Sequence, residues 1–208
     1  MTEILDIYDE NLNHIGTKAR TLVHQDGDWH RVFHCWVIYR DKLGVDYLVM
    51  QRRASEKRIY PNLLDVTAAG HYEAGETIAD GVREIQEELG LAVDFTDLIP
   101  LGKRVYAARI GLLLDYQISD VFFLINDQSL EQYVLQPTEV AEVVAFKVDD
   151  GLDFCSGNIE QIKAQVFGGL NTTVMLQQVD FIPNIDAYLY KILILAKRCL
   201  NGETHLVI

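Results

Sequence analysis

Three closely spaced glutamates, Glu84, Glu87 and Glu88, are the residues whose type and spacing most directly suggest chemistry. Their intervals of three and four residues place all three side chains on one face of a helix. Like charges at these intervals destabilise a bare helix, and the dipole at its C-terminal end also disfavours anions. Hard oxygen ligands in such a group suit Mg²⁺ or Mn²⁺. We therefore expect a divalent cation among them, the common alternative being a solvated acidic face.

Residues 77–89 have the features of a helix that would present these glutamates. Thr77 followed by Asp80 resembles a capping box, and Gly90 is typical of a helix C-terminus. Four apolar residues recur at helical intervals and predict one stripe that faces a sheet: Ile78, Val82, Ile85 and Leu89. The cation would therefore be held on the face opposite the core.

The surroundings of the glutamates favour a binding site over a solvated face. Gly70 and Gly75 predict a tight loop before the helix, where backbone carbonyl groups are available as ligands. Arg83 can clamp a carboxylate or a phosphate through two hydrogen bonds. A basic group lies just upstream in an otherwise negative chain: Arg52, Arg53, Lys57 and Arg58.

The run from Gly70 to Leu91 resembles the signature box of the Nudix hydrolases, Gly-x5-Glu-x7-Arg-Glu-U-x-Glu-Glu-x-Gly-U, where U is aliphatic. Residues 83–91 match every fixed position of its second half. Only six residues separate Glu76 from Arg83, where the pattern has seven. The short spacing leaves the role of Glu76 open, and a shortened loop explains it most simply.

The resemblance implies a fold, a cofactor and a set of roles. The fold is an α/β Nudix-type α/β/α sandwich with a mixed sheet. Mg²⁺ or Mn²⁺ would be bound by Glu84, Glu87, Glu88 and the Gly70 carbonyl oxygen. Glu84 would orient or deprotonate the attacking water, and Arg83 would fix the geometry of the carboxylates. The implied reaction is hydrolysis of a diphosphate linkage in a nucleoside-diphosphate-like or other organic substrate, and the sequence does not identify the attached moiety.

The resemblance extends over roughly residues 1–150, to the subgroup similar to isopentenyl-diphosphate isomerase. It rests on Tyr8-Asp-Glu-Asn, Trp36, Gln51-Arg-Arg53, Tyr60-Pro61 and Gly70-His71. By this likeness Arg53 and Lys57 would bind the diphosphate. His24, His30 and His71 match metal-binding histidines of the isomerase and form a candidate second metal site, the alternative being an inherited scaffold without a metal.

Two other functions stay open. The isomerase has a cysteine for proton transfer at carbon where this chain has Ala69, and alanine has no proton to exchange. An isopentenyl-diphosphate isomerase-like activity is therefore disfavoured but remains an alternative. A non-catalytic sensor of a nucleotide ligand is the other. Three further acidic residues are candidates for an additional ligand or base: Asp120, Glu139 and Glu142.

The expected elements form one compact unit with an appended segment. Residues 1–150 predict the Nudix domain, with a strand hairpin within residues 1–30, and residues 151–208 predict a C-terminal helical extension. Strands are expected at residues 33–39, 47–52, 64–68, 103–108, 116–125 and 140–148, and helices at residues 158–166 and 185–200. The last helix is apolar around most of its circumference, so it needs cover from the preceding helix or from a second subunit, and we predict a homodimer.

The amino-acid composition limits the kinds of partner that the protein can bind. The 208 residues have 18 Lys and Arg against 31 Asp and Glu, a net charge of −13, which argues against nucleic-acid binding. Three widely separated cysteines form neither a metal motif nor a disulfide framework. No apolar run is long enough to span a membrane, and no signal peptide is recognisable. We expect a cytoplasmic enzyme whose partner is a small-molecule diphosphate.

Overall fold

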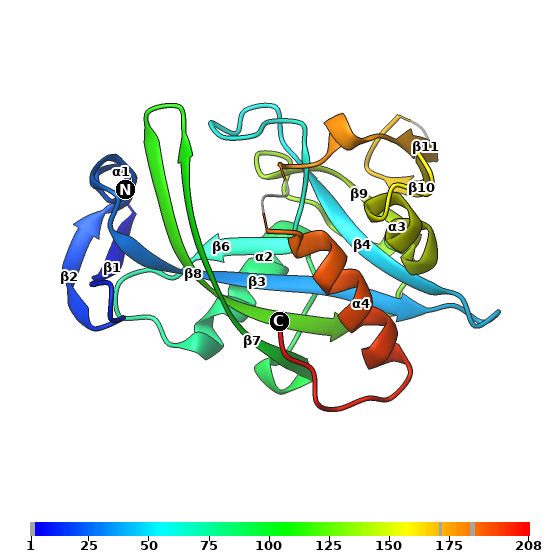
Figure 1. Cartoon of the computed structure of the whole chain (residues 1–208), viewed down its shortest axis with the longest axis horizontal. Helices are drawn as coiled ribbons and strands as arrows, with labels where there is room; N and C mark the ends of the chain where they lie inside the picture. Colours follow the sequence, from blue (N-terminus) through cyan, green and yellow to red (C-terminus); the bar gives the residue numbers. More distant parts are fainter. Residues whose placement is uncertain (1–2, 171, 184–185) are drawn as a thin grey trace.

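Figure 1 shows the computed structural model of the chain, which describes residues 3–170, 172–183 and 186–208. Within these residues eleven strands join one sheet. The strands are β1 (Ile4–Tyr8), β2 (His14–Ala19), β3 (Trp29–Arg40), β4 (Asp46–Arg53), β5 (Leu64–Asp65), β6 (Ala68–His71), β7 (Leu98–Ile110), β8 (Leu113–Ile125), β9 (Val140–Lys147), β10 (Ile162–Phe167) and β11 (Thr173–Leu176). The α-helices are α1 (Arg20–Asp26), α2 (Arg83–Leu89), α3 (Val148–Cys155) and α4 (Tyr188–Leu200). Short 3₁₀ helices are η1 (Ile78–Val82), η2 (Phe95–Asp97), η3 (Leu130–Gln132) and η4 (Gln178–Asp180).

The long strand β3 organises the sheet. It pairs in parallel with β8 along residues 29–38 and antiparallel with β4, β6 and β1. The path runs β11-β10-β9-β4-β3-β1-β2, and β7 and β8 form a long hairpin. One parallel pair within an otherwise antiparallel arrangement makes the sheet mixed, as predicted.

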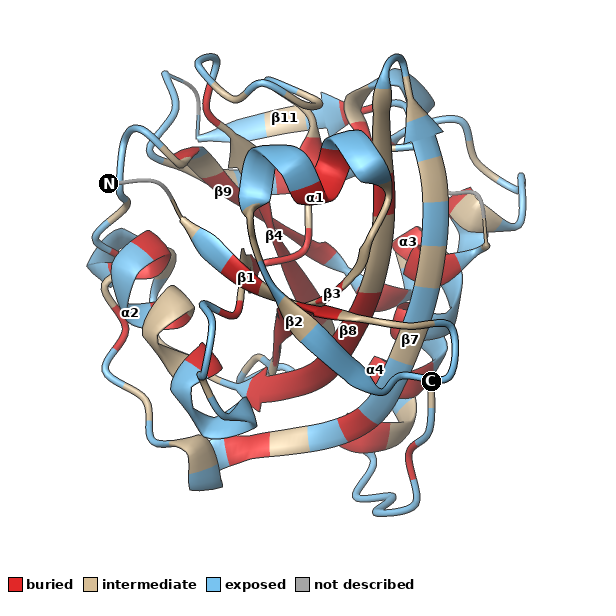
Figure 2. Ribbon diagram, turned by 90° about the vertical axis from the view of Figure 1, so that its left-hand side faces the viewer, coloured by how far each residue is buried: buried red, intermediate tan, exposed pale blue. Residues whose placement is uncertain are grey.

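Each face of β3 belongs to a different core. Cys35 and Val37 pack in a cluster that includes Ile85 of α2. Trp36 and Ile38 pack in a second cluster with residues of α3 and α4. Because successive strand residues point to opposite faces, helices cover both sides of the sheet, and the buried central strands lie between them (Figures 1 and 2). This confirms the predicted α/β/α sandwich.

The C-terminal helix α4 is covered from within the chain. Its buried residues are Tyr188, Leu189, Ile192, Leu193, Leu195, Ala196 and Cys199. At about 100° per residue they form one broad face, and Tyr190 and Ile194 on the other face are exposed, so the predicted burial on more than one side is wrong. The buried face packs on the sheet and on α3, a helix that the sequence analysis missed. A Cβ atom at Gly151 of α3 would lie 3.0 Å from Leu193 side-chain atoms, so glycine permits this close packing.

The predicted helix over residues 158–166 is wrong. Residues 162–167 form strand β10, which pairs antiparallel with both β9 and β11. Ile162 and Ala164 are buried while Lys163 and Gln165 are exposed, and this alternation is the period of a strand. The segment after residue 150 therefore contributes two strands to the sheet as well as α4.

Smaller differences concern the ends of elements. The N-terminal hairpin is present as β1 and β2, and the short helix α1 that follows it was not predicted. The hairpin of β7 and β8 is longer than the predicted strands. The predicted start of the last helix, Ile185, lies outside the described residues, and α4 begins at Tyr188. No helix within the described residues has the length and apolar character needed to cross a membrane.

Candidate active site

The loop before α2 tolerates its missing residue through a 3₁₀ helix. Residues 77–89, predicted as one helix, form η1 followed by α2. The Asp80 carboxylate accepts the Thr77 backbone N–H at 2.7 Å, which is the predicted capping interaction. A 3₁₀ turn has fewer residues per turn than an α-helix, so it accommodates the shorter spacing. Arg83 still binds Glu76 through two hydrogen bonds, of 2.8 and 3.2 Å. The shortened segment thus keeps these two side chains together.

Gly70 allows the Glu84 carboxylate to lie directly against β6. A Cβ atom at Gly70 would lie 2.0 Å from Glu84 Cδ, which no side chain could share. Arg83 Nη1 lies 2.7 Å from Glu84 Oε1. Glu84 is therefore fixed between the Gly70 backbone and the Arg83 guanidinium.

The carboxylate cluster, defined as Glu84, Glu87 and Glu88, is partly buried. Glu88 is 5% exposed, and the Glu87 side chain is 59% exposed. Glu88 Oε2 accepts hydrogen bonds from the Ala69 backbone N–H at 3.0 Å and from Gln51 Nε2 at 3.1 Å. Burial raises the pKa of Glu84 to about 7 and that of Glu88 to about 8. Burying two neighbouring carboxylates is costly unless a cation compensates them.

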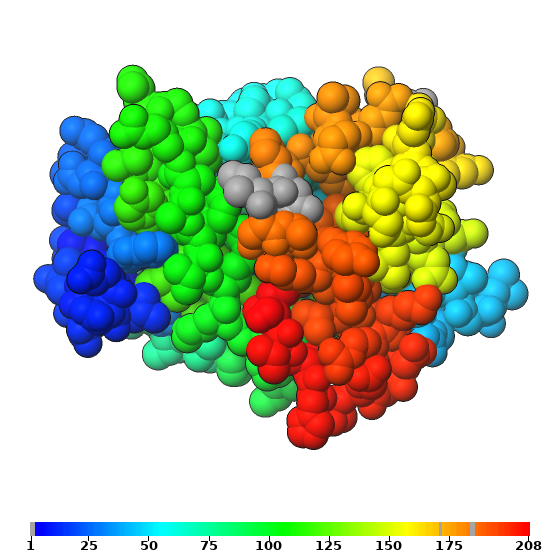
Figure 3. All heavy atoms as spheres, viewed as in Figure 1, coloured from blue at the N-terminus to red at the C-terminus, as the bar shows by residue number. Residues whose placement is uncertain are grey.

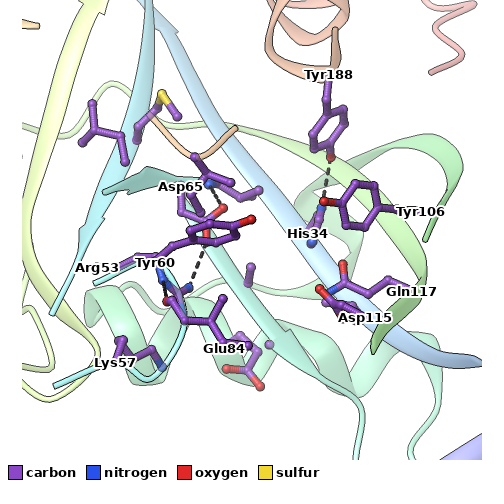
Figure 4. A pocket seen from close by; sticks show the side chains of 18 of the residues that line it. His34, Arg53, Lys57, Tyr60, Asp65, Glu84, Tyr106, Asp115, Gln117 and Tyr188 are labelled. Carbon is purple, nitrogen blue, oxygen red and sulfur yellow. Dashed lines mark hydrogen bonds and ion pairs between the residues drawn. The ribbon is translucent and has the colours of Figure 1, made fainter. Parts of the chain in front are cut away.

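All three glutamates line a cavity of about 970 Å³, and Figure 4 shows Glu84 at one end of it. Arg53 and Lys57, the predicted diphosphate ligands, line the same end (Figure 4). Arg53 Nη1 donates to Asp65 at 2.9 Å, and Lys57 forms an ion pair with Glu139. Burial, followed by the charge of Arg53, lowers the pKa of Lys57. This end of the cavity therefore combines carboxylates for a cation with cations for an anion.

The structure brings together the three predicted histidines, although they come from separate segments. In this histidine cluster, defined as His24, His30 and His71, the potential ligand atoms lie within 4.8 Å of one another. Asp115 Oδ1 lies 3.6 Å from His24 Nδ1 and 3.8 Å from His30 Nε2. Burial lowers the pKa of His30 to about 4 and holds that of His71 well below its usual value. Neutral imidazoles are the form that binds metals.

Two nitrogen atoms of this cluster lack hydrogen bonds. His30 Nε2 and His71 Nε2 are buried, and neither has a partner among the described residues. Buried polar atoms are normally satisfied, so such atoms call for an explanation. A metal ion at the centre of the cluster would provide one.

The acidic candidates outside α2 have different surroundings. Asp120 is buried and paired with Arg31 and Lys103, while Glu142 is paired with Arg52. Only Glu139 of the three lines the cavity. Asp120 and Glu142 therefore form ion pairs away from the carboxylate cluster.

Sequence reasoning missed two polar residues that contact these clusters. Gln51 was noted only as part of a resemblance, yet its amide holds Glu88. Asp115 was not considered, although it is a buried aspartate in β8. An acidic residue inside a strand of mostly apolar residues was the available signal for Asp115.

Comparison with known proteins agrees with this geometry. A model of the NUDIX domain matches residues 28–164. An uncharacterized Nudix hydrolase of Clostridium acetobutylicum is 36% identical over 200 residues, covering 93% of this chain and 96% of that protein. An isopentenyl-diphosphate Delta-isomerase of Cutibacterium acnes is 41% identical over 145 residues, covering 69% of this chain and 66% of that protein.

The fold has a counterpart among solved structures. A crystal structure of a Deinococcus radiodurans protein aligns with a TM-score of 0.55 and 22% identity, covering 74% of this chain and 90% of that one. The fold and the glutamate-bearing helix thus define a Nudix domain. The chain belongs to the Nudix hydrolase family, and it is a hydrolase that acts on diphosphate bonds. Members of this family generally use divalent metal ions.

Proposed function

We propose that this protein is a Mg²⁺-dependent hydrolase of an organic diphosphate, with Mn²⁺ as the alternative ion. The observation that carries the proposal is that half-buried Glu84 and buried Glu88 line the same cavity as Arg53 and Lys57, with Glu84 near these basic side chains in Figure 4. A metal-bound diphosphate needs both kinds of group, because the carboxylates hold the cation and the basic side chains hold the anion.

The donor set fits a hard divalent cation. The carboxylate cluster and the Gly70 carbonyl provide oxygen ligands only, which suits Mg²⁺ or Mn²⁺. Burial raises the pKa values of Glu84 and Glu88 despite the Arg83 ion pair and the hydrogen bonds from Ala69 and Gln51, so a bound cation would favour their ionised forms. When bound, the cation supplies charge neutralisation for the diphosphate and lowers the pKa of a water molecule.

The roles of the side chains follow from their contacts. Glu84 orients or deprotonates the attacking water, because it is held at the cavity by Gly70 and Arg83. Arg83 fixes the carboxylate side, and Arg53 and Lys57 bind the diphosphate. Catalysis of this kind depends mainly on positioning and charge stabilisation, which these residues supply.

The test is a hydrolysis screen with Mg²⁺, Mn²⁺ or excess chelator. Substrates are nucleoside diphosphate sugars, dinucleotides, nucleoside triphosphates and prenyl diphosphates, with released phosphate species measured. We expect turnover of at least one diphosphate that stops when the metal is removed. Turnover that persists in chelator would refute the metal-dependent mechanism.

Two results of this screen would favour the other functions. Exchange of solvent protons into isopentenyl diphosphate would indicate an isomerase, despite Ala69 in β6. Cys155 also lines the cavity, but burial raises the pKa of its thiol, which disfavours the reactive thiolate. Binding of Mg²⁺ and a nucleotide without any turnover would indicate a sensor.

The histidine cluster is proposed as a second metal site. The support is the pair of unsatisfied nitrogen atoms, the low pKa of two of the imidazoles and the adjacent Asp115. Imidazole with carboxylate suits Zn²⁺, Mn²⁺ or Fe²⁺. Metal analysis of the purified protein tests the proposal, since the site predicts a tightly held ion besides the one at α2.

Two predictions about the whole protein have their own tests. The apolar surface of α4 that motivated a homodimer is packed against α3 and the sheet, leaving Ile194 and Tyr190 as its more exposed apolar residues. Sedimentation of the protein at tens of micromolar tests the homodimer, and a monomer would refute it. The cytoplasmic location is tested by fractionation of the source cells.

A further inference from the structure

The cavity is larger than its carboxylate end needs. At about 970 Å³ it lies at the upper end of the range of about 300–1,000 Å³ for ligand sites. Tyr60 lies between the diphosphate-binding end and the opposite side (Figure 4). Its positive φ of 51° is unusual for a residue other than glycine. The space beyond Tyr60 leaves room for a large group attached to the diphosphate.

The opposite side, here called the far wall, carries hydrogen-bonding groups from separate parts of the chain. It consists of His34 from β3, Tyr106 from β7, Gln117 from β8 and Tyr188 from α4. Figure 3 shows the C-terminal segment, in orange and red, next to the green hairpin of β7 and β8. The far wall is thus completed by Tyr188, which follows the matched NUDIX segment that ends at residue 164.

Contacts within the far wall hold its groups in place. His34 Nδ1 and Trp36 Nε1 lie 3.1 and 3.0 Å from the Tyr188 hydroxyl oxygen. The Arg104 guanidinium stacks on the rings of Tyr106 and Tyr188, at 4.3 and 4.2 Å from their centroids. Asp186 accepts two hydrogen bonds from Arg104, at 2.9 and 3.0 Å. A preorganised wall of this kind loses little entropy when it binds a ligand.

The four side chains of the far wall are neutral donors and acceptors, and the Asp115 carboxylate lines the cavity beside Gln117. Arg104 is neutralised by Asp186, and burial lowers the pKa of His34 to about 3, so this imidazole is uncharged. Gln117 Nε2 is engaged with both oxygens of Asp115 at 3.0 Å. Phenol, imidazole and amide groups are typical partners for hydroxyl groups of a ligand.

We propose that the far wall is the subsite that recognises the organic moiety of the substrate, and that it selects a neutral, hydroxylated sugar ring over a hydrocarbon chain. A hydrocarbon would displace water from these polar groups without replacing its hydrogen bonds, which is unfavourable. Apolar residues such as Met50 and Leu64 line another part of the cavity and supply contact area for either kind of ligand. The inference rests on the proposed function, because it specifies the substrate of the same site.

The test compares two kinds of diphosphate, UDP-glucose and geranyl diphosphate, by turnover with Mg²⁺ and by calorimetric binding with Ca²⁺ in its place. We expect tighter binding and a higher kcat/KM for UDP-glucose. UDP, which keeps the base and the pentose but lacks the hexose, then distinguishes the two sugar sources: UDP binds as tightly as UDP-glucose if the pentose is recognised, and more weakly if the hexose is. Tighter binding of geranyl diphosphate would overturn the inference.

A matched pair of variants tests the residues themselves. Tyr106 lines the cavity, whereas Tyr116, on the paired strand, packs on Trp29 at 5.2 Å and does not line it. Tyr106→Phe should weaken UDP-glucose binding about 3- to 10-fold, the effect of one neutral hydrogen bond. Geranyl diphosphate should bind Tyr106→Phe as it binds the parent, and Tyr116→Phe should leave both ligands unchanged. An equal loss for both ligands would indicate a structural role and refute the assignment.

Tyr188→Phe provides a second test. It leaves the Trp36 N–H without its partner, so thermal melting must accompany the binding measurement. If the variant folds, its preference for UDP-glucose over geranyl diphosphate should fall. Absence of turnover for every substrate, with selective UDP-glucose binding retained, would refute the proposed hydrolase function but support the subsite. Turnover with a preference for geranyl diphosphate would support the proposed hydrolase function and refute the subsite.

Discussion

The carboxylate cluster and the histidine cluster serve the same cavity but are held in opposite ways. Within the carboxylate cluster, Glu88 is positioned by the Ala69 N–H and the Gln51 amide, and Glu84 by Arg83. The histidine rings pack on one another with centroids 4.8 to 5.5 Å apart, and two of their nitrogen atoms have no partner among the described residues. Hydrogen bonds to the carboxylate oxygens therefore preorganise the first cluster. In the second, backbone carbonyls hold only one nitrogen each of His24 and His30, and ring packing and Asp115 provide the remaining contacts. A metal ion should stabilise both, and by different amounts.

The largest effect is expected for Glu88→Gln. Removing a proposed ligand of the cation should lower kcat/KM by more than about 100-fold, since even residues that only orient a ligand change metal affinity or activity about 10- to 100-fold. The metal-free variant should be at least as stable as the parent, because one buried charge is gone. Steady-state kinetics measures the loss of kcat/KM, and isothermal titration with Mg²⁺ and Mn²⁺ measures the loss of metal affinity. Glu131→Gln, on exposed η3, is the control, and unchanged metal affinity in Glu88→Gln would disprove the ligand set.

The two clusters should also give the metal-free protein opposite pH dependences. The pKa of Glu88, raised from 4.5 to about 8, favours folding at low pH, and this contribution is lost as the pH rises through that range. The pKa of His30, lowered from 6.5 to about 4, favours folding above pH 6.5, and this contribution is lost as the pH falls towards 4. The two ranges overlap from pH 4.5 to 6.5, where the two contributions oppose each other. Urea denaturation from pH 4 to pH 9 should therefore give a plateau of stability in the overlap, a fall above it from Glu88 and a fall below it from His30.

Adding Mg²⁺ tests which cluster causes each pH dependence. Mg²⁺ should restore the stability of the protein at alkaline pH, where the carboxylates are ionised, and should have little effect at acidic pH. In Glu88→Gln the alkaline loss should be smaller without any metal. An alkaline loss of equal size in the variant would show that other groups cause it.

Removal of a histidine tests the second cluster by itself. His30→Gln should lower the tightly bound metal by one ion per chain, because it removes one of three nitrogen ligands and leaves Asp115 without that neighbour. Elemental analysis after dialysis measures the loss, and His205→Gln, at an exposed position, is the control. Equal metal content in the parent and His30→Gln would mean that the cluster is a packed scaffold without a metal.

The smallest change, a modest loss of Mg²⁺ affinity, is expected for Gln51→Leu. This change removes the amide that donates to Glu88 but keeps a side chain of similar volume in the buried position. Mg²⁺ affinity should fall about 10-fold, the lower part of the range for residues that orient a metal ligand. The exposed Gln165→Leu is the matched control. A change in kcat with unaltered metal affinity would place Gln51 in another role.

The sequence predicted the carboxylate cluster because one short helix carries it. Ile85 and Leu89 are fully buried as the apolar stripe requires, but Ile78 is partly exposed because it begins a separate 3₁₀ helix. The histidine cluster was accessible only through resemblance, since no local pattern links His24 with His71. Asp115 and the far wall depend on contacts between distant segments, which a single sequence does not reveal.

The errors in secondary structure have physical causes. The predicted boundary between residues 150 and 151 falls inside α3, where Gly151 allows the two C-terminal helices to approach. The strand β10 was mistaken for a helix because its alternation is short and apolar residues also recur at helical intervals there. The helix α1 begins without a side-chain cap, so the usual signal for its start is missing.

Tyr188 belongs to two parts of the protein at once. Its ring is buried in the core with α4, and its hydroxyl reaches the cavity next to His34. A mutation that changes what this surface recognises would therefore also alter a residue on which folding depends. Evolution of new substrate preferences through α4 should consequently be slow and should require compensating changes in the core, whereas the hairpin residues Tyr106 and Gln117 can vary more freely.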